Sequence, residues 1–257
     1  EPIGRRLSNS ASQKLNTNFL SHQTSTYRCQ RRPRNSQTRD AQTAHFIPEQ
    51  QIKVAEKQHP KPQVGIYGGS FNPIHMGHIS LAKTLLQHTQ LDEIWFMVSP
   101  LNPFKRMADD LLADNQRLEL TRLALADEPN LIACDFEFRL PKPSYTYDTL
   151  CRLHETYPEK AFTLIMGSDN WAAFDRWKNH QEILLHYPII IYPRKHSPLC
   201  AEQLPPSVTL VDTPLYDFNS TDIRRRISHD MPIHGMVKPQ IEEKTRLYYQ
   251  QLSHENL

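Results

Sequence analysis

Two histidines stand three residues apart behind a group of glycines in the stretch GIYGGSFNPIHMGHISLA, which begins at Gly65. The chain has only seven glycines, and four of them lie here. Gly68 and Gly69 permit a tight turn and a close approach of backbone to a ligand. A hydrophobic run precedes them and a helical pattern follows, so the turn opens a helix whose N–H groups and dipole favour phosphate. The stretch therefore predicts a phosphate-binding loop.

The two imidazoles suit the same chemistry. At positions i and i+3 near a helix start, His75 and His78 can point the same way, and Gly77 leaves room between them for a substrate. An imidazole N–H donates to a phosphate oxygen, and the phosphate charge favours the imidazolium. Capping or packing histidines are the alternative from the residues alone. A metal site is not indicated, because no third ligand has suitable spacing. Neither the dinucleotide fingerprint G-x-G-x-x-G nor the P-loop pattern is present.

Short β-rich runs alternate with helical patterns along the rest of the chain. Asp114 could cap the second helix, and Ser144 or Thr146 the third. This alternation predicts an α/β fold, a Rossmann-like parallel sheet with helices on both faces in a single domain. The expected strands are 63–68, 93–100, 130–140, 162–167, 188–193 and 207–213, and the expected helices are 78–89, 114–127, 144–157, 179–187, 220–229 and 240–252.

Ligands of such sheets bind beyond the carboxyl ends of the strands, so the loops at that edge are the candidates for the functional site. These loops are 68–78, 99–106, 167–177, 193–197 and 213–221.

Residues 1–62 differ in composition from the rest. They carry eleven Lys and Arg against four Asp and Glu, whereas residues 63–257 carry nineteen against twenty-four. The first segment is also poor in aliphatic residues, so it predicts a disordered basic extension before a folded domain at 63–257. A segment outside the natural protein, a transit peptide, and a tail that binds RNA or a membrane surface remain open as its origin.

Other function classes find little support. The four cysteines, Cys29, Cys134, Cys151 and Cys200, form no CxxC pair, so neither a zinc cluster nor a thioredoxin motif is indicated. Reduced thiols are typical of cytosolic proteins, and no apolar run approaches the roughly 18 residues of a membrane helix. We expect a cytoplasmic protein with neither nucleic-acid nor membrane partners, and the sequence leaves the oligomeric state open.

The segment GGSFNPIHMGH resembles the signature of the HxGH nucleotidyltransferase superfamily. Four further stretches, in the same order and with matching spacing, narrow the resemblance to the bacterial nicotinate-nucleotide adenylyltransferases. It covers residues 64 to 252, essentially the whole expected domain. The four stretches are SPLNPFK (99–105), PSYTYDTL (143–150), MGSDNWAAFDRWKNHQEIL (166–184) and DTPLYDFNSTDIR (212–224).

The resemblance implies transfer of the adenylyl group of ATP to nicotinate mononucleotide in NAD biosynthesis. It implies catalytic roles at the ATP phosphates for His75, His78, Lys105 and Arg224. Phe104 stands where the family usually has histidine, and Phe218 and Asn219 stand where it has Ile and Ser; Asn219 can still cap a helix. Such a transfer needs positioning and neutralisation of charge more than covalent chemistry.

The family pattern also implies the binding residues. A carboxylate suits ribose hydroxyls, an aromatic ring can stack on the pyridine, and backbone and hydroxyl donors can receive the nicotinate carboxylate. ATP is expected to contact Gly68, Gly69, Ser70, Phe71, Gly167, Asp169, Arg194, Ser220 and Thr221, and the nicotinate nucleotide is expected to contact Ser144, Tyr145, Thr146 and Trp177.

Mg²⁺ is expected to accompany ATP, held by phosphate oxygens and water, so no protein ligand is assigned. The alternatives are a pantetheine-phosphate or other mononucleotide adenylyltransferase, and a nucleotide-binding protein without catalysis. The segments SYTYDTL and DRWKNHQEIL favour the nicotinate enzyme. The presence of both histidines and of Ser220, Thr221 and Arg224 argues against a degenerate binding protein.

Overall fold

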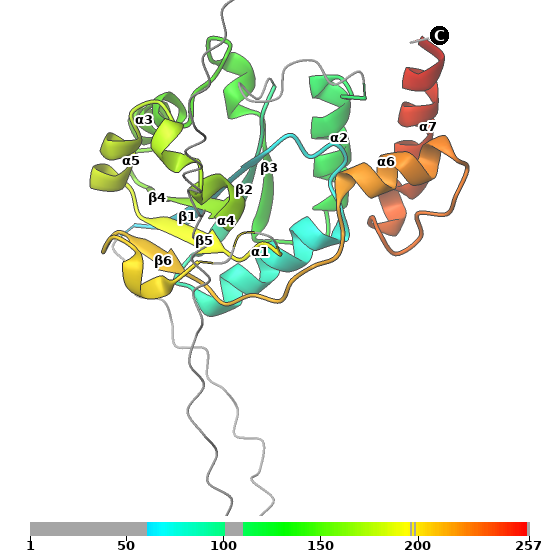
Figure 1. Ribbon diagram of the computed structural model, residues 1–257. Coiled ribbons are helices and arrows are strands. Elements are labelled where there is room, and N and C mark those ends of the chain that lie inside the picture. Colours follow the sequence, from blue (N-terminus) through cyan, green and yellow to red (C-terminus); the bar gives the residue numbers. More distant parts are fainter. Residues whose placement is uncertain (1–60, 101–109, 196, 198, 256–257) are drawn as a thin grey trace, which may run out of the picture. The chain divides into compact units, whose positions relative to one another are not determined.

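The six expected strands form one sheet in the computed structural model of the protein (Figure 1). All neighbouring strands run parallel, in the order β3-β2-β1-β4-β5-β6. The strands are β1 (Gln63–Gly69), β2 (Glu93–Val98), β3 (Leu131–Cys134), β4 (Ala161–Gly167), β5 (Ile189–Tyr192) and β6 (Val208–Leu210). The Rossmann-like parallel sheet expected from the sequence is thus confirmed.

The strand order reverses beside β1. The chain builds outward from β1 to β2 and β3, then returns to place β4 on the opposite side of β1, where Tyr67 pairs with Ile165. The connections that follow β1 and β4 run toward opposite edges of the sheet. This divergence opens a crevice at the carboxyl ends of β1 and β4. This switch point is where a ligand is expected.

Helices cover both faces of the sheet. The structure shows α1 (Met76–His88), α2 (Asp114–Ala124), α3 (Thr146–Thr156), α4 (Ser168–Trp171), α5 (His180–His186), α6 (Ser220–Ser228) and α7 (Pro239–Glu255). Side chains from α1, α2, α6 and α7 share one core with Tyr67, Phe96 and Tyr192, and α7 packs against both α2 and α6. Side chains from α3 and α5 share the other core with Ile66, Met97 and Ile191.

Alternation along the strands separates the two cores. Val64 and Ile66 on β1 face α3 and α5, whereas Tyr67 faces α1. Because successive side chains of a strand point to opposite faces, a strand covered on both sides is apolar throughout, as Ile189–Tyr192 is.

Several local expectations were wrong. Ala113 precedes α2 as its cap, and Asp114 is the first helical residue, where it pairs with Arg117. Tyr145 precedes α3, so neither Ser144 nor Thr146 caps that helix. The strand expected over 130–140 ends at Cys134, and a 3-10 turn follows at Phe136–Arg139. The short helix α4 and the 3-10 turns at Phe174–Arg176 and Ala201–Gln203 were not anticipated.

The structure describes residues 61–100, 110–195, 197 and 199–255. The disordered extension expected before residue 63 therefore lies, up to residue 60, outside the described residues, as do Phe104 and Lys105. Lys61 and Pro62 already contact the fold: Lys61 Nζ donates to the carbonyl of Pro158, and the Pro62 carbonyl accepts from Ala161 N–H. Within the described part, no helix has the length and apolarity that crossing a membrane requires.

Candidate functional site

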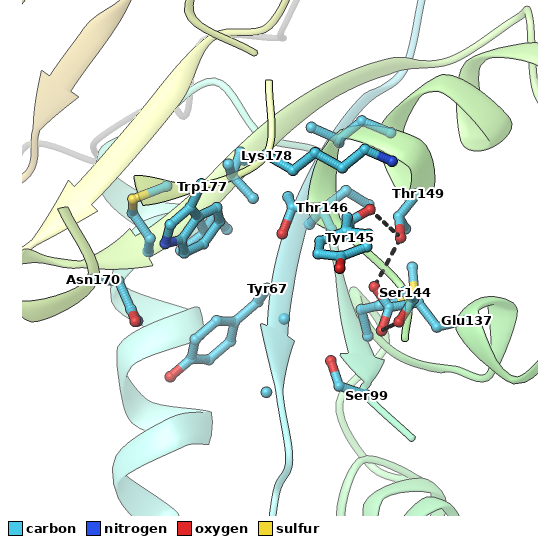
Figure 2. A pocket seen from close by; sticks show the side chains of 18 of the residues that line it. Tyr67, Ser99, Glu137, Ser144, Tyr145, Thr146, Thr149, Asn170, Trp177 and Lys178 are labelled. Carbon is cyan, nitrogen blue, oxygen red and sulfur yellow. Dashed lines mark hydrogen bonds between the residues drawn. The ribbon is translucent and has the colours of Figure 1, made fainter. Parts of the chain in front are cut away.

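A first pocket opens at the carboxyl ends of β1, β2 and β4, at the switch point of the sheet (Figure 2). Its wall combines the end of β1 with the start of α3 and with the segment after α4. We call it the first pocket, and its lining includes Tyr67, Gly68, Gly69, Ser99, Glu137, Ser144, Tyr145, Thr146, Thr149, Asn170, Trp177, Lys178 and Tyr192.

Trp177 and the start of α3 form two sides of the first pocket. The Trp177 ring packs against the buried Phe174, with centroids 5.5 Å apart, and leaves part of its surface accessible. Tyr145 precedes α3 without a side chain that caps the helix. The first N–H groups of α3 therefore offer hydrogen-bond donors and a positive dipole end to an anion in this pocket.

Glu137 places a buried carboxyl group in the wall of the first pocket. It accepts hydrogen bonds from the hydroxyl groups of Ser144 (3.2 Å) and Thr149 (2.9 Å), as the dashed lines in Figure 2 show. Burial raises the pKa of Glu137, and the hydroxyl donors act against that rise. The Ser144 hydroxyl, expected to face the nicotinate, is thus engaged with Glu137.

A second pocket lies on the other side of Tyr67, between α1 and the segment before α6. We call it the second pocket, and it is lined by Tyr67, His75, Gly77, His78, Leu81, Tyr192, Pro193, Arg194, Thr213, Pro214, Tyr216 and Phe218. Its polar side-chain groups are imidazole, guanidinium, phenol and the Thr213 hydroxyl, a set that suits an anionic ligand such as a polyphosphate.

The two histidines stack in the wall of the second pocket. Their ring centroids are 3.6 Å apart with an interplanar angle of 22°. His78 Nδ1 accepts the backbone N–H of His75 at 3.3 Å. Since Nδ1 is the acceptor, the neutral His78 ring carries its proton on Nε2, where it can be donated to an oxygen.

His75 is held neutral by its surroundings. Burial, and then the charge of Arg194, lower the pKa of His75 to about 3. Its Nδ1 is buried and has no hydrogen-bond partner among the described residues. Burial and Arg194 thus favour the neutral imidazole at His75, against the effect that a neighbouring phosphate charge would have.

Gly77 does not leave an empty space for substrate, contrary to expectation. A Cβ atom at this position would lie 3.1 Å from His75 Nδ1 and 3.1 Å from Phe218 Cβ. Protein atoms fill the room that glycine provides, so Gly77 serves the close packing of the histidine pair against Phe218.

Arg194 follows β5 and connects several groups at the same edge. Its Nη2 donates to Tyr192 Oη at 3.1 Å, and its guanidinium lies 5.1 Å from the centre of that ring. Its Nε is 3.8 Å from Asp169 Oδ1. A Cβ at Gly167 would lie 3.1 Å from the same Nε, so the glycine lets Arg194 approach the end of β4. Asp169 lies inside α4, and Gly167 stands at the cap position of that helix.

Arg224 is engaged away from the two pockets. It donates to Asp110 Oδ2 at 2.6 Å and to the Asn72 carbonyl at 2.8 Å. Ser220 donates to the Pro73 carbonyl at 3.0 Å, and Thr221 Oγ1 accepts from Arg224 at 3.4 Å. The start of α6 thus holds the loop after β1. As expected, Asn219 caps this helix and accepts the N–H of Asp222 at 2.7 Å.

Arg117 on α2 forms hydrogen bonds with both the loop after β1 and the loop after β2. Its side chain is completely buried, and it donates to the carbonyls of Ser70 (2.6 Å) and Ser99 (2.9 Å). It also donates to the carbonyl of Leu112 and forms an ion pair with Asp114 at 2.6 Å. The backbone of both loops is therefore positioned by one cation.

Among the described residues no three His, Cys, Asp or Glu side chains gather in a way that could hold a metal ion. The described side chains therefore fit a magnesium ion that arrives with a nucleotide, whose phosphate oxygens supply most of its ligands.

Comparison with known proteins identifies the family. Residues 66–226 match the family model described as cytidylyltransferase-like. A probable nicotinate-nucleotide adenylyltransferase of Bacteroides thetaiotaomicron is 45% identical over 200 residues, which are 78% of this chain and 98% of that protein. One from Cytophaga hutchinsonii is 42% identical over 189 residues, 73% of this chain and 98% of that protein. The chain belongs to the nicotinate-nucleotide adenylyltransferase family.

A solved adenylyltransferase also shares the fold. The nicotinic acid mononucleotide adenylyltransferase of Plasmodium falciparum, solved in complex with NaAD, has a TM-score of 0.63 at 20% identity. The likeness covers 75% of this chain and 98% of that one.

Most of the site residues expected for this adenylyltransferase meet at one edge of the sheet. His75, His78 and Arg194 line the second pocket, and Gly167 and Asp169 adjoin Arg194. Gly68, Gly69, Ser144, Tyr145, Thr146 and Trp177 line the first pocket.

Other expected residues lie elsewhere. Phe71 is buried in the core beside Tyr67 and Phe96, at a positive φ of 43°, and lines neither pocket. Ser70 is also outside both pockets and contributes its carbonyl to Arg117. Ser220, Thr221 and Arg224 group around Asn72, Pro73 and Asp110. Lys105 is outside the described residues.

Sequence reasoning missed four residues of this adenylyltransferase's site. Tyr67 and Tyr192 line both pockets, Glu137 anchors the wall of the first, and Arg117 holds the two loops. Arg117 had a detectable signal, because it lies on the buried stripe of its helix with Leu120, Thr121 and Ala124. A charged residue on such a stripe indicates a required partner.

The low pKa of His75 makes the protein sensitive to acid. Unfolded His75 takes up a proton near pH 6.5, but folded His75 does so only near pH 3. Between these values the unfolded state binds more protons, so stability falls as pH falls. Between pH 7 and pH 5, protonation of unfolded His75 lowers the unfolding free energy of the wild type by about 2 kcal/mol. We expect this contribution to be absent in His75→Gln.

Urea unfolding of both proteins at several pH values measures this difference. His186→Gln changes an exposed histidine and is the matched control, expected to follow the wild type. Parallel pH dependence of His75→Gln and wild type would show that His75 titrates normally in the fold.

Proposed function

We propose that the protein transfers the adenylyl group of ATP to nicotinate mononucleotide, which yields nicotinate adenine dinucleotide and pyrophosphate. The observation that carries this proposal is the pair of pockets that share Tyr67 and Tyr192 at the switch point. One pocket has the chemistry for a flat ring with a small anionic substituent, and the other has the chemistry for phosphates.

The first pocket is the proposed mononucleotide site. Trp177 offers an aromatic face for stacking on the pyridine ring. The uncapped start of α3, with Tyr145 and Thr146, supplies backbone donors for the nicotinate carboxylate. Because Glu137 already engages the hydroxyls of Ser144 and Thr149, the backbone donors are the ones we assign to the carboxylate.

The second pocket is the proposed site of the ATP phosphates. An oxygen of the mononucleotide phosphate attacks the α-phosphorus of ATP in line, and the bond from that phosphorus to pyrophosphate breaks. Charge that develops on the phosphoryl oxygens is stabilised by His78, which donates from Nε2, and by Arg194. Neutral His75 orients His78 through the stacked rings and the backbone bond.

The remaining assignments concern the rest of ATP. Gly68, Gly69 and Ser70 are proposed to approach it through the backbone. Gly167 and Asp169 are proposed at the adenosine ribose. These assignments rest on the family pattern, together with the place of Gly68 and Gly69 in the wall of the first pocket and of Asp169 beside Arg194.

Arg224, Ser220 and Thr221 are proposed to hold the pyrophosphate end of ATP, together with Lys105. For this role Arg224 releases Asp110, whose side chain is half exposed, and pairs with phosphate oxygens instead. Mg²⁺ enters as part of the MgATP substrate, where it neutralises phosphate charge.

We further propose residues 63–257 as the catalytic domain and the cytoplasm as its location. The thiols of Cys134 and Cys151, which form no disulfide, are the supporting observation, since reduced cysteines are typical of that compartment.

Glu137 favours nicotinamide mononucleotide as the second candidate acceptor. An ionised carboxyl in the wall of the first pocket repels a nicotinate carboxylate and tolerates an uncharged carboxamide. The rise in the pKa of Glu137 on burial works against this repulsion, because it favours the neutral acid.

Pyrophosphate release tests the proposal. Purified full-length protein is given MgATP and, separately, nicotinate mononucleotide, nicotinamide mononucleotide or phosphopantetheine. We expect the largest kcat/KM with nicotinate mononucleotide. A larger value with nicotinamide mononucleotide would favour the second candidate, and release only with phosphopantetheine would overturn both.

A further inference from the structure

Tyr67 and Tyr192 are the only described residues that line both pockets. Tyr67 lies on β1 and Tyr192 on β5, and each side chain is about 4% exposed. Their hydroxyl oxygens are 3.5 Å apart. Ser144 and Ser99 lie on one side of the first pocket in Figure 2, and the Tyr67 hydroxyl points away from them. The pair thus forms the boundary at which ligands of the two pockets would meet.

The pair has one proton more than its internal contact can use. Two phenols bring two O–H donors, and the single contact between their oxygens employs one of them. Arg194 only donates to Tyr192 and cannot accept a proton. No other acceptor for either hydroxyl occurs among the described residues. One buried O–H group therefore faces the pocket boundary without an acceptor.

Arg194 decides which phenol keeps the unused proton. Its guanidinium donates to Tyr192 Oη at 3.1 Å, which makes the Tyr192 proton a better donor to Tyr67. The resulting chain runs from Arg194 through Tyr192 to Tyr67, and the Tyr67 proton is left to point outward. Burial raises the pKa of Tyr67 well above its usual range, so the hydroxyl remains a donor at neutral pH.

We propose that Tyr67 is a further catalytic residue, whose hydroxyl donates to a phosphate oxygen at the junction of the two nucleotides, with Tyr192 and Arg194 as its positioning residues. This inference rests on the proposed adenylyl transfer. It adds a donor on β1, beside His78 at the start of α1, whose ring centroid is 6.1 Å from that of Tyr67. A phosphate at the boundary is the acceptor that satisfies the buried O–H group.

Removal of one hydroxyl tests the role. Tyr67→Phe keeps the ring and its edge-on contacts with Phe71 and Phe96. We expect kcat/KM to fall about 10- to 100-fold, the value of a hydrogen bond to a charged group. Tyr192→Phe should cause a smaller loss, because the Tyr67 hydroxyl remains but loses its orientation. Tyr157→Phe is the matched control: its ring packs on Trp95 at 5.2 Å, away from both pockets.

Binding of the dinucleotide product separates this role from a structural one. Nicotinate adenine dinucleotide places its bridging phosphates at the pocket boundary. Calorimetric titration should show a Kd about 10-fold higher for Tyr67→Phe, while the melting temperature stays close to that of the wild type. A Tyr67→Phe enzyme within twofold of wild type in both kcat/KM and Kd would overturn the inference and leave the proposed function intact.

Failure of the proposed function has a different signature. In that case the wild type neither forms nor binds the dinucleotide. Titration of wild type and Tyr67→Phe with ATP then decides the role of the phenol. An affinity about 10-fold weaker in the variant supports phosphate contact, and equal affinity overturns it.

Discussion

Replacement of His78 by alanine is expected to lower kcat about 10²- to 10³-fold, with folding intact. Loss of a single preorganised donor to a transition-state oxygen has an effect of this size. His78 Nε2 is such a donor, because Nδ1 is occupied by the backbone N–H of His75. The residue is only half buried, so its removal leaves little empty space in the core. Steady-state pyrophosphate release and thermal unfolding measure the two quantities.

Two variants control this experiment. His186→Ala removes an exposed histidine from α5 and should leave kcat unchanged. His78→Gln retains an N–H donor on a shorter side chain and should recover part of the activity. If His78→Ala turns over at a rate near that of the wild type, His78 does not stabilise the transition state and the assignment passes to Arg194.

The convergence of the site could be predicted because it follows from chain topology. In a parallel sheet, the segments that follow the strands reach one edge, so His75, Trp177 and Arg194 are expected at the same edge although they are far apart in sequence. Glycine-rich turns and aromatic residues in these segments carry a recognisable signal. No knowledge of individual side-chain contacts was needed for this part of the site.

Contacts that depend on strand register could not be predicted. Tyr67 and Tyr192 are 125 residues apart on β1 and β5, and they face each other only because β4 lies between these strands in one alignment. The stacking of His75 on His78 was not predicted either. Phe218 fills the space beside Gly77, and its position depends on the long segment before α6.

Replacement of Arg117 by methionine is expected to destabilise the protein by about 3–5 kcal/mol. Methionine fills a similar volume but leaves the carbonyls of Ser70 and Ser99 without their donor in a buried site. It also leaves the Asp114 carboxylate without its partner. For a domain of this size the melting temperature should fall by roughly 6–20 °C. Thermal and urea unfolding provide the measurement.

Arg122→Met is the matched control on the same helix. The Arg122 side chain is 57% exposed and pairs with Asp135 at the surface, so its loss should cost about 0–1 kcal/mol. Arg117→Lys separates charge from geometry. It keeps the cation near Asp114, but its single ammonium cannot replace the planar fork that reaches both loops. We therefore expect Arg117→Lys to recover only part of the stability that Arg117→Met loses. If Arg117→Met melts within a few degrees of Arg122→Met, the loops after β1 and β2 are held by other contacts, such as those of Asn72 with Asp110 and Leu112.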